Sequence, residues 1–306
     1  MTYFYVILKK TVISYGSEDE IKKMPCRSFK NHETSSMKHK DLKTIVKEKY
    51  SQIARQYAKP EKASGCGCAP AGCCGTDFSF IGEDYRTLEG YDSAADLGLG
   101  CGIPTEYAGL KPGHRVLDLG CGAGNDCFVA RSQVGEGGWV TGLDFSADML
   151  LKARHNLNKT GYDNLEFIEG DIENMPFEGD SFDVVLSNCV INLVPDKGQA
   201  FRETFRVLKV GGHFCFSDVV VRGQLPDSLR EDAELYAGCV SGAADLHDYL
   251  ATVRQAGFGD PVIHKLREIE VPPSIIFNHI SAADHKRFME EGTGIYSLTI
   301  SAVKPA

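Results

Sequence analysis

The chain has 306 residues, of which 42% are apolar and 25% are charged, and its formal net charge is −9. These proportions exclude a largely disordered chain, a collagen-like repeat and a coiled coil, and the length corresponds to about two domains of roughly 150 residues each. The acidic balance argues against nucleic acid as a partner, because nucleic-acid-binding proteins need a basic surface. Basic residues are concentrated in residues 1–60, which hold 13 Lys and Arg against 6 Asp and Glu. This pattern indicates a solvated tail and a surface helix.

The sequence contains no signal for a membrane or for export. No apolar run reaches the roughly 18 residues of a membrane-spanning helix, and the apolar start at residues 1–8 lacks the basic residues and the cleavage site of a signal peptide. We therefore expect a cytoplasmic protein that makes no membrane contact. In that reducing compartment the 11 cysteines should be thiols, and their odd number also argues against a disulfide framework.

The part of the chain before residue 112 has two kinds of segment. Residues 1–37 show no sustained period and are predicted to be a disordered extension. Apolar positions between 38 and 58, Tyr50 among them, predict an amphipathic helix. Glycine-rich loops complete the predicted N-terminal region, 38–111. The first of these loops contains four cysteines: Cys66, Cys68, Cys73 and Cys74.

From residue 112 strands and helices alternate, which predicts an α/β domain with a parallel, doubly wound, Rossmann-like sheet over 112–222. The predicted strands are 115–119, 139–143, 165–169, 182–187 and 213–217, with helices at 125–134, 149–160 and 198–208 and a turn at 209–212. Residues 226–258 look mainly helical, and 262–271 and 295–303 are predicted to form an antiparallel pair. Residues 223–306 are therefore expected to be a C-terminal α+β region that covers the substrate.

The ends of the first two predicted strands carry a nucleotide-binding pattern. The strand 115–119 runs into a turn that contains Gly120, Gly122 and Gly124 and then opens a helix. Glycines in such a turn can adopt positive φ and let the backbone approach a ligand closely. The next strand is followed by Asp144, whose carboxylate is placed to accept hydrogen bonds from two ribose hydroxyls.

Two further acids distinguish between nucleotide cofactors. Asp118 lies inside the first strand, where it would repel a pyrophosphate but suits a ligand with an amino group and a sulfonium. Asp171, followed by Ile172, comes after the third strand and can accept a bond from an adenine amino group. Phe145 is expected to pack on the adenine or in the core. These residues resemble those of the class I S-adenosylmethionine-dependent methyltransferases over about residues 112–220, which implies S-adenosylmethionine as the cofactor.

Three cysteines are predicted to meet beside this cofactor. Cys189 follows the fourth strand directly after Asn188, which we expect to contact the cofactor, while Cys101 and Cys239 lie before and after the α/β domain. A cysteine trio suits a soft, thiophilic element. Structural zinc prefers four ligands, often in Cys-x-x-Cys pairs, and the sequence has no such pair. Trivalent arsenic takes three thiolates and keeps a lone pair. Cys127 and Cys215 are predicted to be small buried residues, and the small size of Cys121 is enough to explain its place in the glycine turn.

Four motifs make the resemblance more specific. They are Gly-Leu-Gly-Cys-Gly at 98–102, Asp-Leu-Gly-Cys-Gly-Ala-Gly-Asn-Asp-Cys at 118–127, Ser-Asn-Cys-Val-Ile-Asn-Leu at 187–193 and Gly-Cys-Val-Ser-Gly-Ala at 238–243. In this order they resemble the motifs of the arsenite methyltransferases. The similarity extends from about residue 38 to residue 257.

The resemblance implies a mechanism and a set of partners. Cys101, Cys189 and Cys239 would bind arsenic, which arrives as arsenite or a thiol complex and is methylated directly. The N-terminal helix would cover the cofactor, with Tyr50 in contact with it. The loop cysteines would serve redox cycling or metalloid capture, and thioredoxin or glutathione would act as reductant. Two alternatives stay open, namely a class I methyltransferase for an organic small molecule and a protein that binds or sequesters a metalloid.

Overall fold

The computed structural model of the chain describes residues 39–56, 81–223, 242–270 and 293–306. Several predictions lie outside these residues: the extension 1–37, the loop cysteines Cys66, Cys68, Cys73 and Cys74, and the predicted arsenic thiol Cys239.

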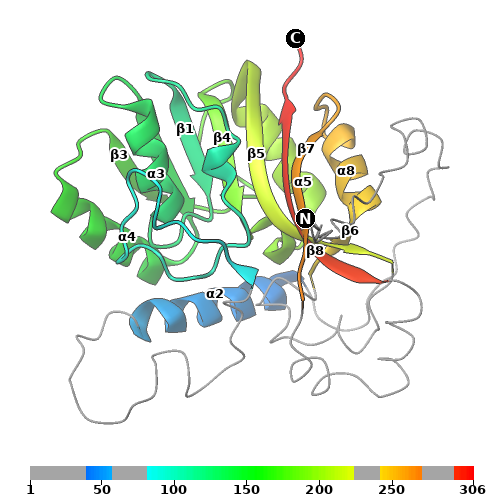
Figure 1. The fold of residues 1–306 in the computed structure, drawn as a ribbon, viewed down its shortest axis with the longest axis horizontal. Coiled ribbons are helices and arrows are strands. Elements are labelled where there is room, and N and C mark those ends of the chain that lie inside the picture. Colours follow the sequence, from blue (N-terminus) through cyan, green and yellow to red (C-terminus); the bar gives the residue numbers. More distant parts are fainter. Residues whose placement is uncertain (1–38, 57–80, 224–241, 271–292) are drawn as a thin grey trace, which may run out of the picture. The chain divides into compact units, whose positions relative to one another are not determined.

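The described residues form an eight-stranded sheet in which β3-β2-β1-β4-β5-β8-β7 lie side by side and β6 pairs with β5 (Figure 1). Strands β1 to β6 pair in parallel, whereas β8 runs antiparallel to both β5 and β7. The strands are β1 (Arg115–Leu119), β2 (Trp139–Asp144), β3 (Leu165–Glu169), β4 (Phe182–Asn188), β5 (Leu208–Arg222), β6 (Ala244–Asp245), β7 (Val262–Glu268) and β8 (Gly294–Val303). The predicted parallel sheet and the predicted antiparallel pair are confirmed, and both belong to one continuous sheet.

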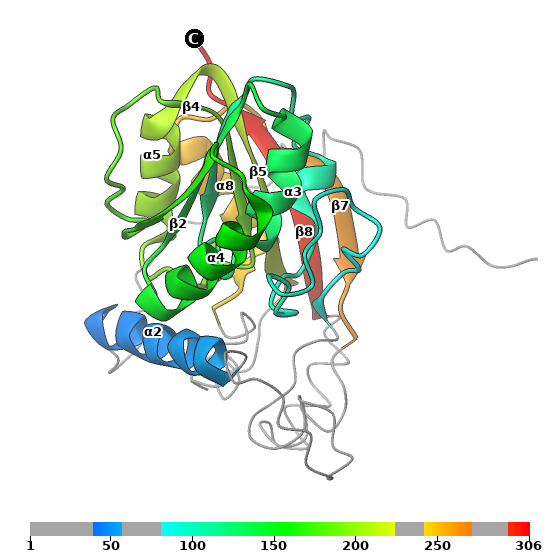
Figure 2. The same ribbon diagram turned by 90° about the vertical axis from the view of Figure 1, so that its left-hand side faces the viewer.

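Helices cover both faces of this sheet. Figure 2 shows α3 and α4 on one face and α5 and α8 on the other, while α2 lies below the sheet, across the ends of its strands. The α-helices are α2 (His39–Gln56), α3 (Asn125–Val134), α4 (Ala147–Thr160), α5 (Lys197–Val207) and α8 (Leu246–Gln255), and the short 3-10 helices are η2 (Pro104–Glu106) and η3 (Ile191–Leu193). This layering is the doubly wound α/β architecture that the alternation of strands and helices predicted.

The two faces of the sheet bury separate apolar clusters, because successive strand residues point to opposite sides. Leu117 of β1 packs in the cluster under α5 and α8, whereas its neighbour Val116 packs in the cluster under α3 and α4. Phe201 of α5 is fully buried, with its ring 5.7 Å from Phe214 and 5.5 Å from Tyr249. Two of the cysteines predicted to be buried, Cys127 and Cys215, lie in the second cluster with no exposed surface.

One prediction about the sheet is wrong. Residues 209–212 were expected to form a turn before a short strand, but they belong to the 15-residue strand β5. Gly211 has φ of 79° and donates a backbone hydrogen bond to Lys304, whose own N–H donates to Gly212. The glycines therefore form an irregularity inside the strand, held by the main chain of the C-terminal segment, instead of ending the strand.

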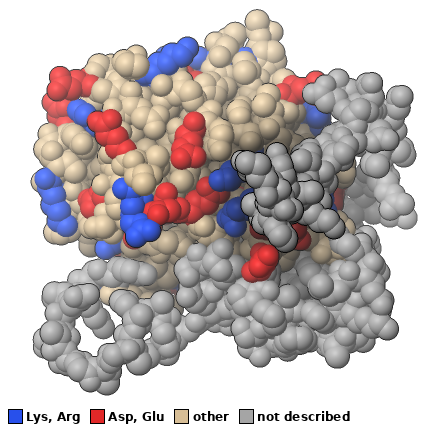
Figure 3. Space-filling view, viewed as in Figure 1, with Lys and Arg blue, Asp and Glu red and all other residues tan. Residues whose placement is uncertain are grey.

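The surface carries both signs of charge. On the face shown in Figure 3, acidic and basic side chains of the described residues are interspersed, and no continuous basic surface is visible there. No helix among the described residues is long and apolar enough to cross a membrane.

Candidate active site

A pocket opens at the carboxyl ends of β1, β2, β3 and β4, where parallel α/β sheets bind their ligands. Most residues predicted to bind the cofactor, together with one of the predicted arsenic thiols, line this pocket: Tyr50, Asp118, Gly120, Gly122, Asp144, Phe145, Asp171, Ile172, Asn188 and Cys189. Gly124 does not line it and has a packing role. It precedes α3 with φ of 98°, and a Cβ atom there would approach the Phe167 ring to 2.8 Å.

The glycine turn is fixed to the neighbouring strand by its backbone. Gly120 and Cys121 both donate to the carbonyl of Leu143, at 2.7 and 3.0 Å. Gly120 has φ of 66°, and a Cβ atom at this position would lie 2.5 Å from the side chain of Val190. The absence of a side chain therefore allows the segment that follows Cys189 to pack directly on the glycine turn.

Asp144 accepts two backbone hydrogen bonds, from Gly122 at 2.9 Å and from Ser146 at 2.8 Å. Its side chain is largely buried, and burial raises the pKa of Asp144 to about 6 in spite of these bonds. Asp144 thus joins the glycine turn to the start of α4, where Ser146 caps the helix. Its predicted contact with ribose hydroxyls stays a prediction.

Two more carboxylates lie buried beside Asp144. Asp118 accepts a hydrogen bond from the Cys127 thiol at 3.1 Å, and Asp126 accepts one from the Tyr85 hydroxyl at 2.9 Å. Burial raises the pKa of Asp118 well above its usual range and that of Asp126 to about 6. Three carboxyl groups in one buried region favour a ligand that brings positive charge.

Two features of the pocket fit S-adenosylmethionine. The buried carboxyl groups suit a sulfonium and an ammonium group. In addition, Asn125 at the start of α3 lines the pocket, and its Oδ1 atom is buried without a hydrogen-bond donor among the described residues. A buried acceptor of this kind is costly unless a ligand supplies the donor.

Helix α2 forms one wall of the pocket, with Lys43, Val46 and Tyr50 in its lining. Val46, one of the apolar positions predicted for this helix, is buried, and so is Ala54. Hydroxyl groups of Ser51 and Ser146, the cap of α4, lie 3.2 Å apart. The helix therefore contacts the elements that hold the cofactor site.

Ion pairs attach α2 to these elements. The Nζ atom of Lys43 lies 2.6 Å from Asp171 and also pairs with Glu173, and Arg55 lies 2.8 Å from Asp148 at the start of α4. Partial burial lowers the pKa of Lys43, but its two carboxylate partners raise it more, so this lysine stays charged. The predicted adenine-binding residue Asp171 is thereby held by α2.

Cys189 has an uncommon backbone conformation. Its φ is 61°, whereas residues other than glycine rarely adopt positive φ. Its N–H donates to the carbonyl of Ser217 on β5 at 2.8 Å, and its side chain is buried in the lining of the pocket. The strained turn brings the chain out of β4 at the point where the cofactor pocket lies.

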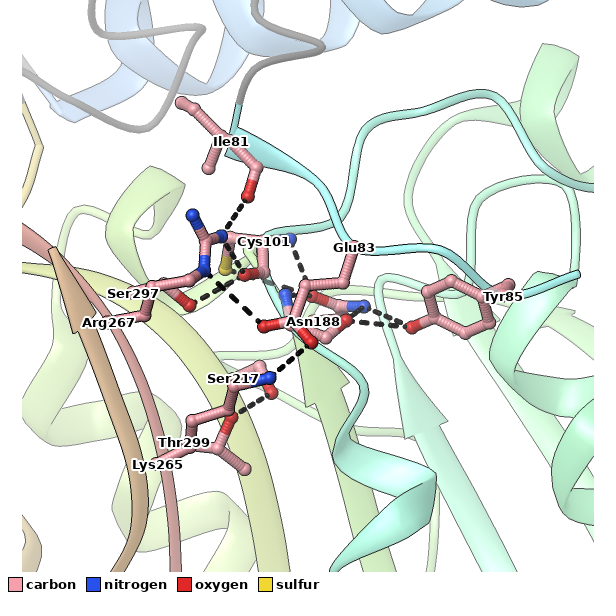
Figure 4. A network of polar contacts seen from close by, with 11 residues as sticks. Ile81, Glu83, Tyr85, Cys101, Asn188, Ser217, Lys265, Arg267, Ser297 and Thr299 are labelled. Atoms are coloured by element: carbon pink, nitrogen blue, oxygen red, sulfur yellow. Dashed lines mark hydrogen bonds and ion pairs between the residues drawn. The ribbon is translucent and has the colours of Figure 1, made fainter. Parts of the chain in front are cut away.

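Asn188 connects Cys189 to the predicted partner thiol Cys101. Its Oδ1 atom accepts the N–H of Cys101 at 3.0 Å, and its Nδ2 atom donates to the carbonyl of Gly102 at 2.8 Å and to the Tyr85 hydroxyl at 2.7 Å (Figure 4). Asn188 lines the pocket as predicted, but its amide is used to hold the Cys101 loop. Cys101 has no exposed surface and lies behind the pocket lining.

Tyr249 interacts electrostatically with both thiols. This hydroxyl donates to the buried carboxyl of Asp218 at 3.3 Å. Burial, the charge of Asp218 and the nearby thiols of Cys101 and Cys189 all raise the pKa of Tyr249. Burial also raises the pKa of Asp218 to about 7. The two described members of the predicted trio are thus brought to one region, with an acid and a hydroxyl beside them.

Sequence reasoning missed several residues of this region. Asp126 follows the glycine turn and Asp218 follows the predicted strand 213–217. Residues at the carboxyl ends of parallel strands often belong to the ligand site, so their positions could have identified both acids. Tyr85, Arg267 and Ser297 gave no such signal, because they belong to segments far away in the sequence. Their contribution depends on the pairing of the strands.

Comparison with known proteins agrees with this geometry. A family model described as a methyltransferase domain matches residues 110–257. The chain is 37% identical to the arsenite methyltransferase of Halobacterium salinarum, over 87% of this chain and 67% of that protein, and 41% identical to that of Homo sapiens, over 53% and 45%. The solved structure of an arsenic (III) S-adenosylmethionine methyltransferase from Chlamydomonas reinhardtii is 39% identical, with a TM-score of 0.57 over 67% of this chain and 68% of that chain.

The sheet, the glycine turn and the acids at the strand ends therefore define a class I methyltransferase, and S-adenosylmethionine is its cofactor. Within this class, the chain belongs to the arsenite methyltransferase family. The fold, the cofactor and the family predicted from the sequence are confirmed. The chain spans between 45% and 67% of the length of the first five curated relatives that it matches.

Cofactor affinity should depend on pH. Burial raises the pKa values of Asp144 and Asp126 to about 6, and a bound cation favours their ionised forms and lowers these values. Binding should therefore release protons near pH 6, so affinity should fall as the pH decreases from 8 to 5, by up to about tenfold per pH unit for each proton. Calorimetry in buffers with different ionisation enthalpies measures this release. Asp144→Asn should flatten the dependence, and a flat wild-type profile would contradict the assignment.

The ion pairs of α2 should contribute to cofactor binding. Lys43→Ala removes the partner of Asp171 and Glu173, and we expect S-adenosylmethionine affinity to fall about two- to fivefold, the range of a partly exposed pair. Lys49→Ala removes a charge from the same helix at a position without an ion pair among the described residues, and it should leave affinity unchanged. Titration calorimetry compares the two variants. Equal affinities in both would show that α2 does not hold the pocket closed.

Proposed function

We propose that this chain transfers methyl groups from S-adenosylmethionine to trivalent arsenic, as arsenite and methylarsenite, held by the thiols of Cys101, Cys189 and Cys239. The proposal includes the detoxification of arsenic as the biological outcome. Among the described residues, one observation carries it: Asn188 ties the Cys101 loop to the strand end that places Cys189 in the cofactor pocket. The names of the relatives at 37% and 41% identity support the same substrate.

Arsenic binds by ligand exchange, in which thiolates replace its hydroxyl groups. Arsenite brings three hydroxyl groups, and each cysteine thiol forms one arsenic–sulfur bond while its proton leaves with a hydroxyl as water. Thiolate sulfur is a preferred ligand for a soft centre, and the exchange leaves the arsenic lone pair free.

S-adenosylmethionine supplies an activated methyl group when it is bound. The arsenic lone pair would form the new bond to the methyl carbon, and the electron pair of the broken carbon–sulfur bond would stay on the sulfur of the cofactor. No general base is needed, because arsenic presents its lone pair directly. The contribution of this chain is to hold the two reacting atoms in line, through the thiols on one side and the buried carboxyl groups on the other.

A reductant completes each cycle. Methyl transfer leaves arsenic formally pentavalent, and two thiols return it to the trivalent state by giving up two electrons and forming a disulfide. We assign the external thiols to thioredoxin or glutathione, and the relay between them and the site to Cys66, Cys68, Cys73 and Cys74. Because such thiol chemistry needs a reducing compartment, we propose the cytoplasm as the location of the protein.

Serine substitutions test the arsenic site. Cys101→Ser, Cys189→Ser and Cys239→Ser should each abolish or strongly reduce arsenite methylation, because a hydroxyl is a poor ligand for a soft centre. Each variant should keep its S-adenosylmethionine affinity. Methylarsenite has two positions left for thiols, so Cys101→Ser should still methylate it. Chromatographic separation of arsenic species, with arsenite or methylarsenite as substrate and a thiol reductant present, measures the two activities, and titration calorimetry measures the S-adenosylmethionine affinity.

Cys215→Ala provides the control, because Cys215 is as fully buried as Cys101 but lies in the core cluster under α3 and α4. This variant should retain arsenite methylation. Full activity in Cys189→Ser or Cys239→Ser would overturn the arsenic site and favour an organic substrate. Arsenic binding without any methylated product from the wild-type protein would favour a metalloid-sequestering protein.

A further inference from the structure

The backbone of the Cys101 loop is held by side chains from three different strands. Asn188 of β4 accepts the N–H of Cys101, as described above. On the other side, the carbonyl of Cys101 accepts the hydroxyl of Ser297 at 2.6 Å and a weaker bond from Nη2 of Arg267 at 3.5 Å (Figure 4). The main-chain donor and acceptor of Cys101 are thus both fixed by side chains distant in sequence.

Ser297 and Arg267 reach this carbonyl from one place in the sheet. They are directly opposite each other in the antiparallel pairing of β7 and β8. Residues opposite each other in such a pair present their side chains on the same face. Ser297 is almost completely buried there, so its hydrogen bond is shielded from water.

A second set of contacts fixes the guanidinium of Arg267. Its Nη2 atom donates to the carbonyl of Ile81 at 2.6 Å, and its Nε atom lies 3.6 Å from Glu83, which pairs with Lys265 at 2.6 Å. Lys265 is two residues before Arg267 on β7, so both basic side chains meet Glu83 from one strand. The antiparallel pair of β7 and β8, here called the β7–β8 hairpin, therefore binds residues 81–83 as well as the Cys101 carbonyl.

The loop also lies too close to the sheet to move inward. A Cβ atom at Gly102 would approach the Ser217 hydroxyl to 2.6 Å, and one at Gly100 would approach Nδ2 of Asn188 to 2.7 Å. With the backbone of Cys101 fixed on both sides, the remaining freedom of its thiol is rotation of its own side chain. A site for three thiols needs each sulfur within about 0.5 Å of its working position.

We propose that Ser297 and Arg267 are positioning residues that set the place of the Cys101 thiol, so that the β7–β8 hairpin controls arsenite binding without contacting the cofactor. This inference rests on the proposed function, in which Cys101 is an arsenic ligand. It assigns to the C-terminal antiparallel pair a specific part of the substrate site.

Ser297→Ala tests the inference, with Ser301→Ala as the matched control. Ser301 lies four residues further along β8, on the same face, and its hydroxyl bonds His264 at 2.8 Å and not the Cys101 loop. The readout is the rate at which iodoacetamide alkylates Cys101, measured by peptide mass spectrometry. Cys215 in the same digest reports general loosening of the fold.

We expect Ser297→Ala to speed alkylation of Cys101 by about five- to tenfold, as suits the loss of one buried hydrogen bond, while Cys215 reacts at its wild-type rate. The sodium arsenite concentration that half-protects Cys101 should rise by a similar factor, and S-adenosylmethionine affinity should stay within about twofold. Ser301→Ala should match the wild type in every measurement, and Ser297→Thr, which keeps the hydroxyl, should restore the wild-type rate.

Equal changes at Cys101 and Cys215, or a fall in cofactor affinity that matches the fall in arsenite protection, would show a general structural role and overturn the inference. An unchanged alkylation rate would overturn it as well. If the wild-type protein failed to methylate arsenite, the proposed function would fall, but the alkylation rates would still show whether the hairpin positions Cys101.

Discussion

The amide of Asn188 is the contact on which the arrangement of the site depends. It lies at the end of β4, one residue before Cys189, and it binds the main chain of Cys101 on the one side and Tyr85 on the other. The end of β4 fixes Cys189 relative to the cofactor pocket. The hydrogen bond of Asn188 then fixes the backbone of Cys101, 87 residues earlier in the chain, relative to the same strand end. The position of the Cys101 backbone relative to Cys189 therefore depends on Asn188 on one side and on Ser297 and Arg267 on the other.

The electrostatics of the pocket follow from the same edge of the sheet. Parallel strands end side by side, so acids placed after several of them become neighbours and are buried together. Burial raises the pKa values of Asp118, Asp126 and Asp144, which is unfavourable for the empty protein but prepares the site for a cation. Helix α2 then adds basic residues at the rim, where Lys43 pairs with acids that follow β3.

Much of this architecture could be predicted from the sequence, because the signals are local. Strands β1 and β3 have the predicted bounds, and the helix expected at 198–208 begins one residue earlier because Asp196 caps it through the N–H of Gln199. The glycine turn, Asp144 and Cys189 stand at strand ends, so their meeting in one pocket followed from the parallel sheet alone. The irregularity at Gly211 was missed because it depends on the distant Lys304.

The holding of Cys101 could not be predicted in the same way. Ser297 and Arg267 become neighbours through the register of β7 and β8, and a shift of one residue would turn both side chains to the other face. Asn188 lines the cofactor pocket as expected, but the additional bonds of its amide to the Cys101 loop were not predicted. Motifs identified the thiols, but the strand pairing determines how they are oriented and held.

The central claim is that arsenic is bound by protein thiols that include Cys189. X-ray absorption at the arsenic edge, on the full chain loaded with one equivalent of arsenite, tests this claim most directly. The account predicts three sulfur neighbours around arsenic in the wild-type protein, and one sulfur replaced by oxygen or by an external thiol in Cys189→Ser. An arsenic atom with oxygen neighbours in the wild-type protein, or an identical sulfur shell in Cys189→Ser, would contradict it.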